Sequence, residues 1–145
     1  MHRREFLTRM ALAPIVTALP AKRARPPMTV YKTPTCGCCG KWVEHVQKAG
    51  FKVTVKDMAD VSPIRKDLGV PESLASCHTA VVGAYLIEGH VPADLIDKIL
   101  TEKPAGRGLT IPGMPASAPG MDIPGQKYNV LLFTTDGKTR VYASR

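Results

Sequence analysis

The sequence predicts a single mixed α/β domain, and three observations lead to that fold class. Over residues 28–68, short runs rich in β-branched and aromatic residues alternate with segments of helical periodicity, in the order strand, helix, strand, helix. Two apolar runs around Gly83 then indicate a β-hairpin, and a helix follows them. A second hairpin is expected at the end of the chain. With 145 residues, such a domain can bury an ordinary hydrophobic core.

Four elements are expected in the first half of the domain. Residues 28–32 predict a strand, and residues 38–49 predict a helix, because apolar side chains recur there at helical spacing. The alternation of apolar and polar residues at 51–55 predicts a second strand. Residues 62–68 predict a short helix, since Pro63 is typical of a first helical turn.

A hairpin, a helix and an irregular segment are expected next. Residues 80–82 and 84–87 predict the hairpin, and Pro92 opens a helix that stops at Pro104. From about residue 106 to residue 125 the chain is rich in Gly and Pro and looks too irregular for a standard element. Residues 128–134 and 139–143 flank an Asp-Gly turn and predict a C-terminal β-hairpin.

The first 27 residues have the features of an export signal and a linker. They hold six Lys/Arg and one acidic residue, so five of the eight formal positive charges lie there. A charged start and a short apolar stretch identify residues 1–21 as a signal peptide, and 22–27 as a linker before a domain at 28–145. Arg3-Arg4-Glu5-Phe6-Leu7 resembles the twin-arginine consensus, although a general secretory signal is the alternative. Both routes predict a periplasmic protein, and no later segment is a membrane-span candidate.

The composition excludes a nucleic-acid-binding function. Outside the first 27 residues the formal net charge is small, and no helix carries a basic stripe. Aromatic residues make up only 6% of the chain, which leaves little to stack against bases. Nucleic acid is therefore not an expected partner.

Four cysteines form two groups that suggest soft-metal or redox chemistry. Three of them occupy Cys36-Gly37-Cys38-Cys39, at the start of the first expected helix, and the fourth, Cys77, is followed by His78. Cys36 and Cys39 form a C-x-x-C pair. A helix N-terminus presents unpaired N–H groups and positive potential, which stabilise thiolates, the form of cysteine that binds metals and attacks disulfides.

Two stretches resemble glutaredoxins. Tyr31-Lys32-Thr33-Pro34-Thr35-Cys36 is similar to the approach to their active site, and residues 80–89 are similar to their later hairpin. The resemblance implies a thioredoxin-like fold. Such oxidoreductases place a cis-proline before that hairpin, whereas this chain has Ser76-Cys77-His78-Thr79 there. In a thioredoxin-like fold Cys77 and His78 would face the first cysteine group, so that four sulfurs and an imidazole come together.

Taken together, the motifs resemble the CopG-type family of exported bacterial proteins, which is copper-associated and thioredoxin-like. The resemblance implies copper binding and a role in copper handling, with other periplasmic copper-handling proteins as partners. It leaves open whether there is turnover. The matching stretches are Thr35-Cys36-Gly37-Cys38-Cys39, Ser76-Cys77-His78-Thr79, Glu88-Gly89-His90-Val91-Pro92-Ala93 and Ile111-Pro112-Gly113-Met114-Pro115 through Pro119-Gly120-Met121.

Disulfides and zinc are the alternatives for the cysteines. Exported proteins commonly pair their cysteines, but the adjacent Cys38 and Cys39 would have to reach partners in diverging directions. Four thiolates also suit a zinc site. However, paired C-x-x-C knuckles are absent from the sequence, and thiolates combined with Met and His favour cuprous copper.

Different roles are expected for the individual histidines and methionines. His78 is expected to be a ligand or to orient one, because it adjoins Cys77. His45 is expected to be an ordinary surface histidine, and His90 is expected to precede or cap a helix. Met114 and Met121 are weaker metal candidates, because methionines in a Gly/Pro-rich segment more often serve packing.

Two functions from different classes remain. The first is a periplasmic protein that holds one or more cuprous ions for copper resistance or homeostasis, through Cys36, Cys38, Cys39, Cys77 and His78. The second is a thiol-disulfide oxidoreductase in which Cys36 attacks and Cys39 resolves the mixed disulfide. A hybrid, in which the thiols change oxidation state together with bound copper, is also open. The copper site needs all four sulfurs, whereas the enzyme needs only two.

Overall fold

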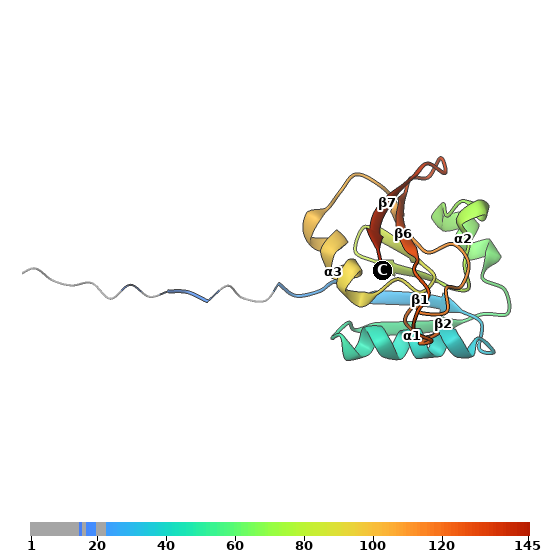
Figure 1. The fold of residues 1–145 in the computed structure, drawn as a ribbon, viewed down its shortest axis with the longest axis horizontal. Helices are drawn as coiled ribbons and strands as arrows, with labels where there is room; N and C mark the ends of the chain where they lie inside the picture. Colours follow the sequence, from blue (N-terminus) through green and yellow to red (C-terminus); the bar gives the residue numbers. More distant parts are fainter. Residues whose placement is uncertain (1–14, 16, 20–22) are drawn as a thin grey trace, which may run out of the picture.

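A mixed sheet of seven strands organises the part of the chain that the computed structural model describes, residues 15, 17–19 and 23–145. The strand order is β2-β1-β3-β4-β5-β6-β7. Figure 1 shows β6 and β7 at the opposite side of the fold from β1 and β2. The predicted signal peptide, residues 1–21, falls mostly outside the described residues and stays a prediction. The elements are β1 (Met28–Lys32), α1 (Gly37–Lys48), β2 (Val53–Asp57), α2 (Ser62–Leu68), the 3-10 helix η1 (Glu72–Leu74), β3 (Thr79–Val82), β4 (Tyr85–Glu88), α3 (Ala93–Glu102), β5 (Gly108–Thr110), β6 (Asn129–Phe133) and β7 (Thr139–Ser144).

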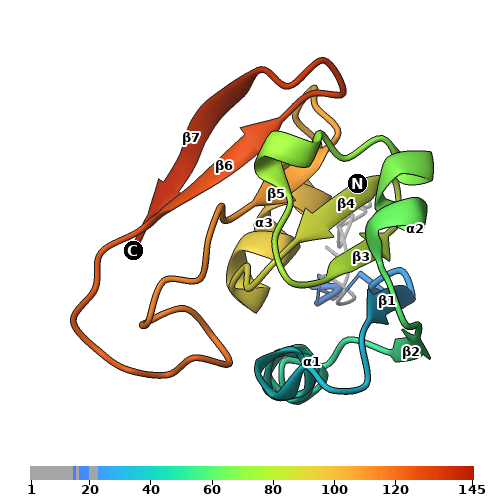
Figure 2. The same ribbon diagram turned by 90° about the vertical axis from the view of Figure 1, so that its right-hand side faces the viewer.

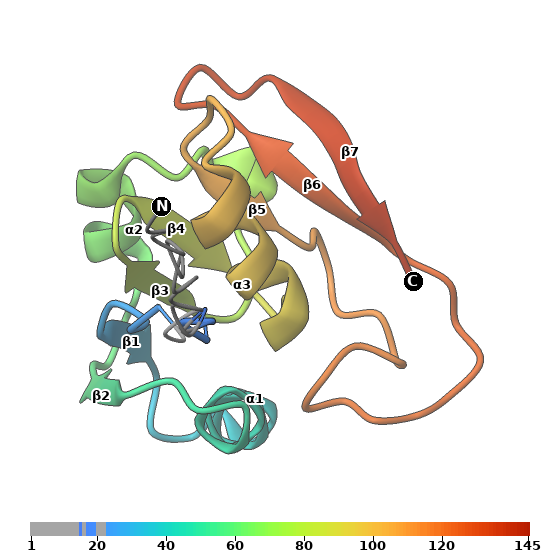
Figure 3. The same ribbon diagram turned by 90° about the vertical axis from the view of Figure 1, so that its left-hand side faces the viewer.

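Helices cover both faces of the sheet. Figures 2 and 3 show α2 on one side of the central strands and α3 on the other. The larger core lies between the sheet and helices α1 and α3, and includes Trp42, which is fully buried. A smaller core around Leu86 and Phe133 lies on the face of α2 and η1. Successive strand residues therefore enter different cores, as the twofold alternation of a strand requires.

The pairing of the strands brings the two ends of the domain into one sheet. β1 pairs with β2 in parallel and with β3 antiparallel, and β3 and β4 form the predicted hairpin. The predicted C-terminal hairpin is also present, as β6 and β7. β5 joins it to the rest, because it pairs in parallel with β4 and antiparallel with β6.

Two sequence-based expectations about the strands were wrong. β5 lies inside the Gly/Pro-rich segment that was expected to contain no standard element. The second strand begins at Val53 instead of residue 51, because the Phe51 N–H donates to Val46 O, 3.1 Å away, and closes the end of α1. None of the helices in the described residues is long and apolar enough to cross a membrane.

Candidate metal centre

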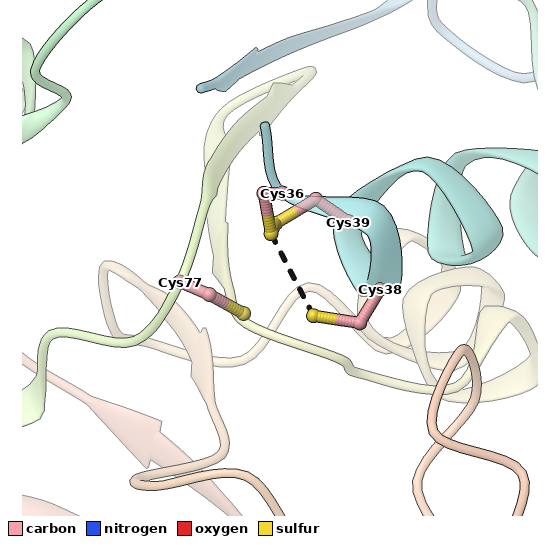
Figure 4. Close-up of side chains that lie close together, drawn as sticks. All are labelled: Cys36, Cys38, Cys39 and Cys77. Atoms are coloured by element: carbon pink, nitrogen blue, oxygen red, sulfur yellow. Dashed lines mark hydrogen bonds between the residues drawn. A yellow bond between two sulfur atoms is a disulfide. The ribbon is translucent and has the colours of Figure 1, made fainter. Parts of the chain in front are cut away.

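The first turn of α1 carries three cysteines. Cys36 is the N-cap residue, and Cys38 and Cys39 follow it in the helix. No side chain caps this end of α1. The first N–H groups of the helix and its positive potential therefore remain close to the sulfur atoms. Figure 4 shows the side chains gathered at this end of the helix.

Cys36 and Cys39 form a disulfide in the structure. Cys38 and Cys77 are free, so the alternative in which all four cysteines form two disulfides was wrong. The Sγ atom of Cys38 lies 3.6 Å from that of Cys36. Cys36 and Cys38 are half-buried, whereas Cys39 is fully buried beneath them.

Cys77 comes to the same place from another part of the chain. It lies in the loop before β3, and β3 pairs directly with β1, the strand that leads into α1. Its side chain points toward the helix start in Figure 4. The sulfur atoms of Cys36, Cys38, Cys39 and Cys77 all lie within 4.8 Å of one another. The convergence expected from the sequence is therefore present, and the role of these atoms as ligands stays a prediction.

His78 is a fully buried histidine beside this cluster. Its Nδ1 atom lies 3.7 Å from Cys77 Sγ, and its ring lies 4.3 Å from that of Trp42, centroid to centroid. Its Nε2 atom is buried without a hydrogen-bond partner. Burial lowers the pKa of His78 to about 3, so the ring stays neutral at physiological pH, the form that binds metals.

His90 belongs to the site, although its sequence position suggested only a residue that precedes or caps a helix. Its Nε2 atom lies 2.9 Å from Cys77 Sγ, and its Nδ1 atom lies 2.7 Å from the carbonyl oxygen of Pro119. A carbonyl only accepts, so Nδ1 carries the proton and the Nε2 lone pair faces the sulfur. Cys77, His78 and His90 thus form a second donor group that shares Cys77 with the first.

The hairpin register explains how His90 reaches Cys77. Thr79 pairs with Glu88 at the open end of the β3–β4 hairpin. Continued two residues beyond the end of each strand, the same register brings Cys77 opposite His90. The hairpin that the sequence predicts around Gly83 already implies this pairing of Cys77 with His90, because residues equally distant from the turn lie opposite each other.

Burial also affects Cys77. It raises the pKa of this thiol to about 11, so the group is protonated in the metal-free protein. A metal ion that binds Cys77 must therefore displace its proton.

The segment between β5 and β6, residues 111–128, lies against the site and is called the flap below. In Figures 2 and 3 it runs from β5 toward α1 and then returns to β6. Gly120 has a positive φ of 92°, and a Cβ there would come within 2.8 Å of Cys38 O. Met121 follows Gly120 and is half-buried, whereas Met114 is 48% exposed.

His45 has a structural role away from the cysteines. It is half-buried, and its Nε2 atom accepts a hydrogen bond from the Ala93 N–H, the first of α3, at 3.0 Å. It therefore satisfies a helix-end donor and is more than an ordinary surface histidine.

Two solved structures are similar to this chain over most of its length. They are forms 1 and 2 of a copper resistance protein, CopG. Form 1 is 39% identical with a TM-score of 0.77, and the match covers 84% of this chain and 98% of that one. Form 2 is 40% identical with a TM-score of 0.75, and the match covers 83% and 98% of the two chains. This chain belongs to the CopG-type family.

A family model matches a shorter part of this CopG-type chain. It is described as "Protein of unknown function, DUF411" and matches residues 74–121. That range contains Cys77, His78, His90 and most of the flap, whereas the cysteines of α1 precede it. A search of the curated proteins gave no match.

The donor atoms fit a soft metal ion. Up to four sulfurs and two neutral imidazoles converge, and thiolates with imidazole nitrogens are the ligands that soft and borderline metals prefer. The Nδ1 atom of His78 is the ring nitrogen that lies 3.7 Å from Cys77 Sγ, whereas its buried Nε2 has no hydrogen-bond partner in the described residues. The disulfide must be reduced before Cys36 and Cys39 can contribute thiolates.

Proposed function

We propose that this CopG-type chain is a periplasmic protein that binds cuprous copper and serves copper resistance or homeostasis. The observation that carries the proposal is the convergence of the four cysteine sulfurs with His78 and His90 around Cys77. Soft thiolates and neutral imidazoles match the polarisability of cuprous copper better than that of harder ions. The similarity to a protein named for copper resistance supports the same ion.

Cys36, Cys38, Cys39 and Cys77 would hold the copper, assisted by His78 and, from the geometry, by His90. Because thiolates can bridge metal ions and Cys77 belongs to both donor groups, the site can take more than one copper. Met121 and Met114 remain weaker candidates. Met121 is the better placed of the two, since it adjoins Gly120, which lies against the first turn of α1.

The Cys36–Cys39 disulfide favours a linked redox function. Its reduction takes up two electrons and two protons and yields the two thiols that the full copper site requires. The second candidate function, thiol-disulfide exchange, has the same pair as its centre, with the half-buried Cys36 attacking and the buried Cys39 resolving. Exchange alone gives no role to Cys38, Cys77 or the two histidines.

The fold and location complete the proposal. We infer that the elements from β1 to α3 form a thioredoxin-like core, to which β5, β6 and β7 are added in one sheet. We also infer that residues 1–21 export the protein, by the twin-arginine route, and that residues 28–145 act as the copper-binding domain. Other periplasmic copper-handling proteins would then be its partners.

Metal analysis combined with a thiol count tests this function. The mature protein is reduced, loaded with cuprous copper without oxygen, and freed of excess metal. We expect at least one tightly bound copper per chain and protection of all four thiols from alkylation. Reduced protein that retains no copper, with four freely reactive thiols, would exclude the copper function and leave thiol-disulfide exchange.

A further inference from the structure

The loop that carries Cys77 and His78 is held by a buried ion pair. Arg65 lies on α2, and Glu88 is the last residue of β4. Arg65 Nε lies 2.9 Å from Glu88 Oε1, and the two side chains are only 13% and 0% exposed. Nε does not align for a hydrogen bond, so the contact there is ionic. The pair connects α2, on one face of the sheet, with the strand that leads to His90.

Both members of the pair bind the backbone of the same residue, Ser76, on either side of its Cα atom. Glu88 Oε1 accepts the Ser76 N–H at 2.7 Å, and Arg65 Nη2 donates to Ser76 O at 2.7 Å. The other carboxylate oxygen of Glu88 accepts a hydrogen bond from Thr79 Oγ1. The residues on both sides of the Cys77-His78 pair are thus fixed to one carboxylate.

Gly89 brings the hairpin close to the same loop. Its N–H donates to His78 O at 3.0 Å, and its φ is 77°. A Cβ at this position would come within 2.6 Å of Ser76 Oγ and 3.3 Å of Ile111 O. Any side chain here would push the Ser76 loop away from β4, so the close approach depends on glycine.

A contribution to stability alone explains this arrangement poorly. The desolvation of two charges largely cancels their attraction, and a buried ion pair can often be replaced by apolar residues at no cost in stability. Metal sites, in contrast, require ligands held within about 0.5 Å of the productive geometry by the groups around them. The pair acts on the backbone next to Cys77 and not on the sulfur itself.

We propose that the Arg65–Glu88 ion pair positions Cys77 and His78 for metal binding, by fixing the backbone N–H and C=O of Ser76. The inference rests on the proposed function, because Cys77 must be a copper ligand for its position to matter. Arg65 and Glu88 are positioning residues and do not touch the metal.

Copper affinity of the reduced protein provides the first test. Arg65→Met/Glu88→Leu removes both charges, so neither is left buried and unpaired. We expect cuprous affinity to fall about 10- to 100-fold, as for other groups that orient metal ligands. Arg65→Met/Glu88→Gln also leaves no charge unpaired but keeps an acceptor for the Ser76 N–H, and it should retain more of the affinity than Arg65→Met/Glu88→Leu. Gly89→Ala displaces the same loop without changing any charge and should weaken binding in the same direction.

A matched control has the same chemistry elsewhere in the protein. Arg25 pairs with Asp97 at 2.7 Å and donates to Ala49 O at 2.6 Å. Arg25→Met/Asp97→Leu therefore removes an ion pair and a carbonyl contact of the same kind, in a more exposed position, and copper affinity should stay at the level of the wild type.

Thiol reactivity provides a second readout that needs no copper. In a Cys36→Ser/Cys38→Ser/Cys39→Ser background, Cys77 is the sole thiol of the chain. Alkylation of this half-buried thiol should become at least about tenfold faster when the Arg65–Glu88 pair is removed, and should not change in the Arg25/Asp97 control.

The combined results separate the two proposals. If Cys77→Ser binds copper like the wild type, the role of Cys77 in the proposed function is wrong. If Cys77→Ser weakens binding but Arg65→Met/Glu88→Leu and Gly89→Ala both behave like the wild type, only the positioning role is overturned. On our account, adding Arg65→Met/Glu88→Leu to Cys77→Ser causes little further loss, because both act through the same ligand.

Discussion

At the scale of single residues, Cys77 is the centre of the proposed site. Its sulfur belongs to the four-cysteine group and to the group formed with His78 and His90. The His90 ring is oriented by Pro119 O, so its free lone pair points at Cys77. Such outer hydrogen bonds commonly orient metal-ligating histidines.

Cys38 distinguishes the two candidate functions. A copper site should lose a sulfur ligand in Cys38→Ser, so cuprous affinity or the number of copper ions per chain should fall, with affinity reduced at least about tenfold. A dithiol enzyme needs only Cys36 and Cys39, and its exchange rate should be nearly unchanged. Chelator competition and a disulfide-exchange assay measure the two properties on the same protein.

Cys36→Ser serves as the reference for this experiment. It should abolish disulfide exchange if exchange occurs at all, because it removes the attacking sulfur. Unchanged copper binding in Cys38→Ser and in Cys77→Ser, with exchange retained in both, would favour the oxidoreductase over the copper protein.

The sequence predicted the cysteines and His78 as neighbours but missed His90. The cysteine motif and the Cys77-His78 pair are visible without a structure, because both are unusual combinations of soft ligands. A lone histidine before a proline has no such signature. Its place opposite Cys77 depends on the register of β3 and β4, and predicted strand ends that are uncertain by one or two residues hide that register.

At the scale of elements, His45 links α1 to α3. It accepts the first N–H of α3, and burial lowers its pKa below the ordinary value of about 6.5. The nearby Asp122 and Asp94 act in the opposite direction without reversing the shift. The folded state thus favours the neutral ring, and this contribution to stability is present above about pH 6.5 and declines as the pH falls below it.

We expect His45→Ala to destabilise the metal-free protein by about 1–3 kcal/mol at pH 8, because it leaves a buried N–H without an acceptor. His45→Gln, whose amide oxygen can accept at any pH, should lose less stability between pH 8 and pH 5 than the wild type. Urea unfolding followed by the fluorescence of Trp42, the sole tryptophan, measures both effects. An equal loss in wild type and His45→Gln would contradict the assigned role.

Most elements could be predicted because their signals are local. The helices over residues 37–48 and 62–68 have an apolar face or a proline start, and both hairpins have clear turns. β5 could not be predicted, because Gly108–Thr110 has only three residues in a Gly/Pro-rich stretch. Its identity as a strand comes from its neighbours β4 and β6, which lie on both sides of it.

At the scale of the whole molecule, the site forms where distant parts of the chain meet. The start of α1, the loop before β3, the residues after β4 and the flap all converge there, and the sheet order fixes their proximity. Ser76 Oγ and His90 Nδ1 hold the flap through Gly113 O and Pro119 O. The sequence motifs identify these segments, but the distances between the segments are set by the packing of the whole fold.

Competition between cuprous copper and zinc is the most direct test of the proposed copper function. The reduced protein is loaded with zinc, titrated with cuprous ion without oxygen, and analysed for both metals after each addition. Because thiolates and neutral imidazoles are soft donors, copper should displace zinc completely and remain bound at one or more ions per chain. Zinc that stays in the thiol site in the presence of excess cuprous ion would contradict the copper function and identify a structural zinc site instead.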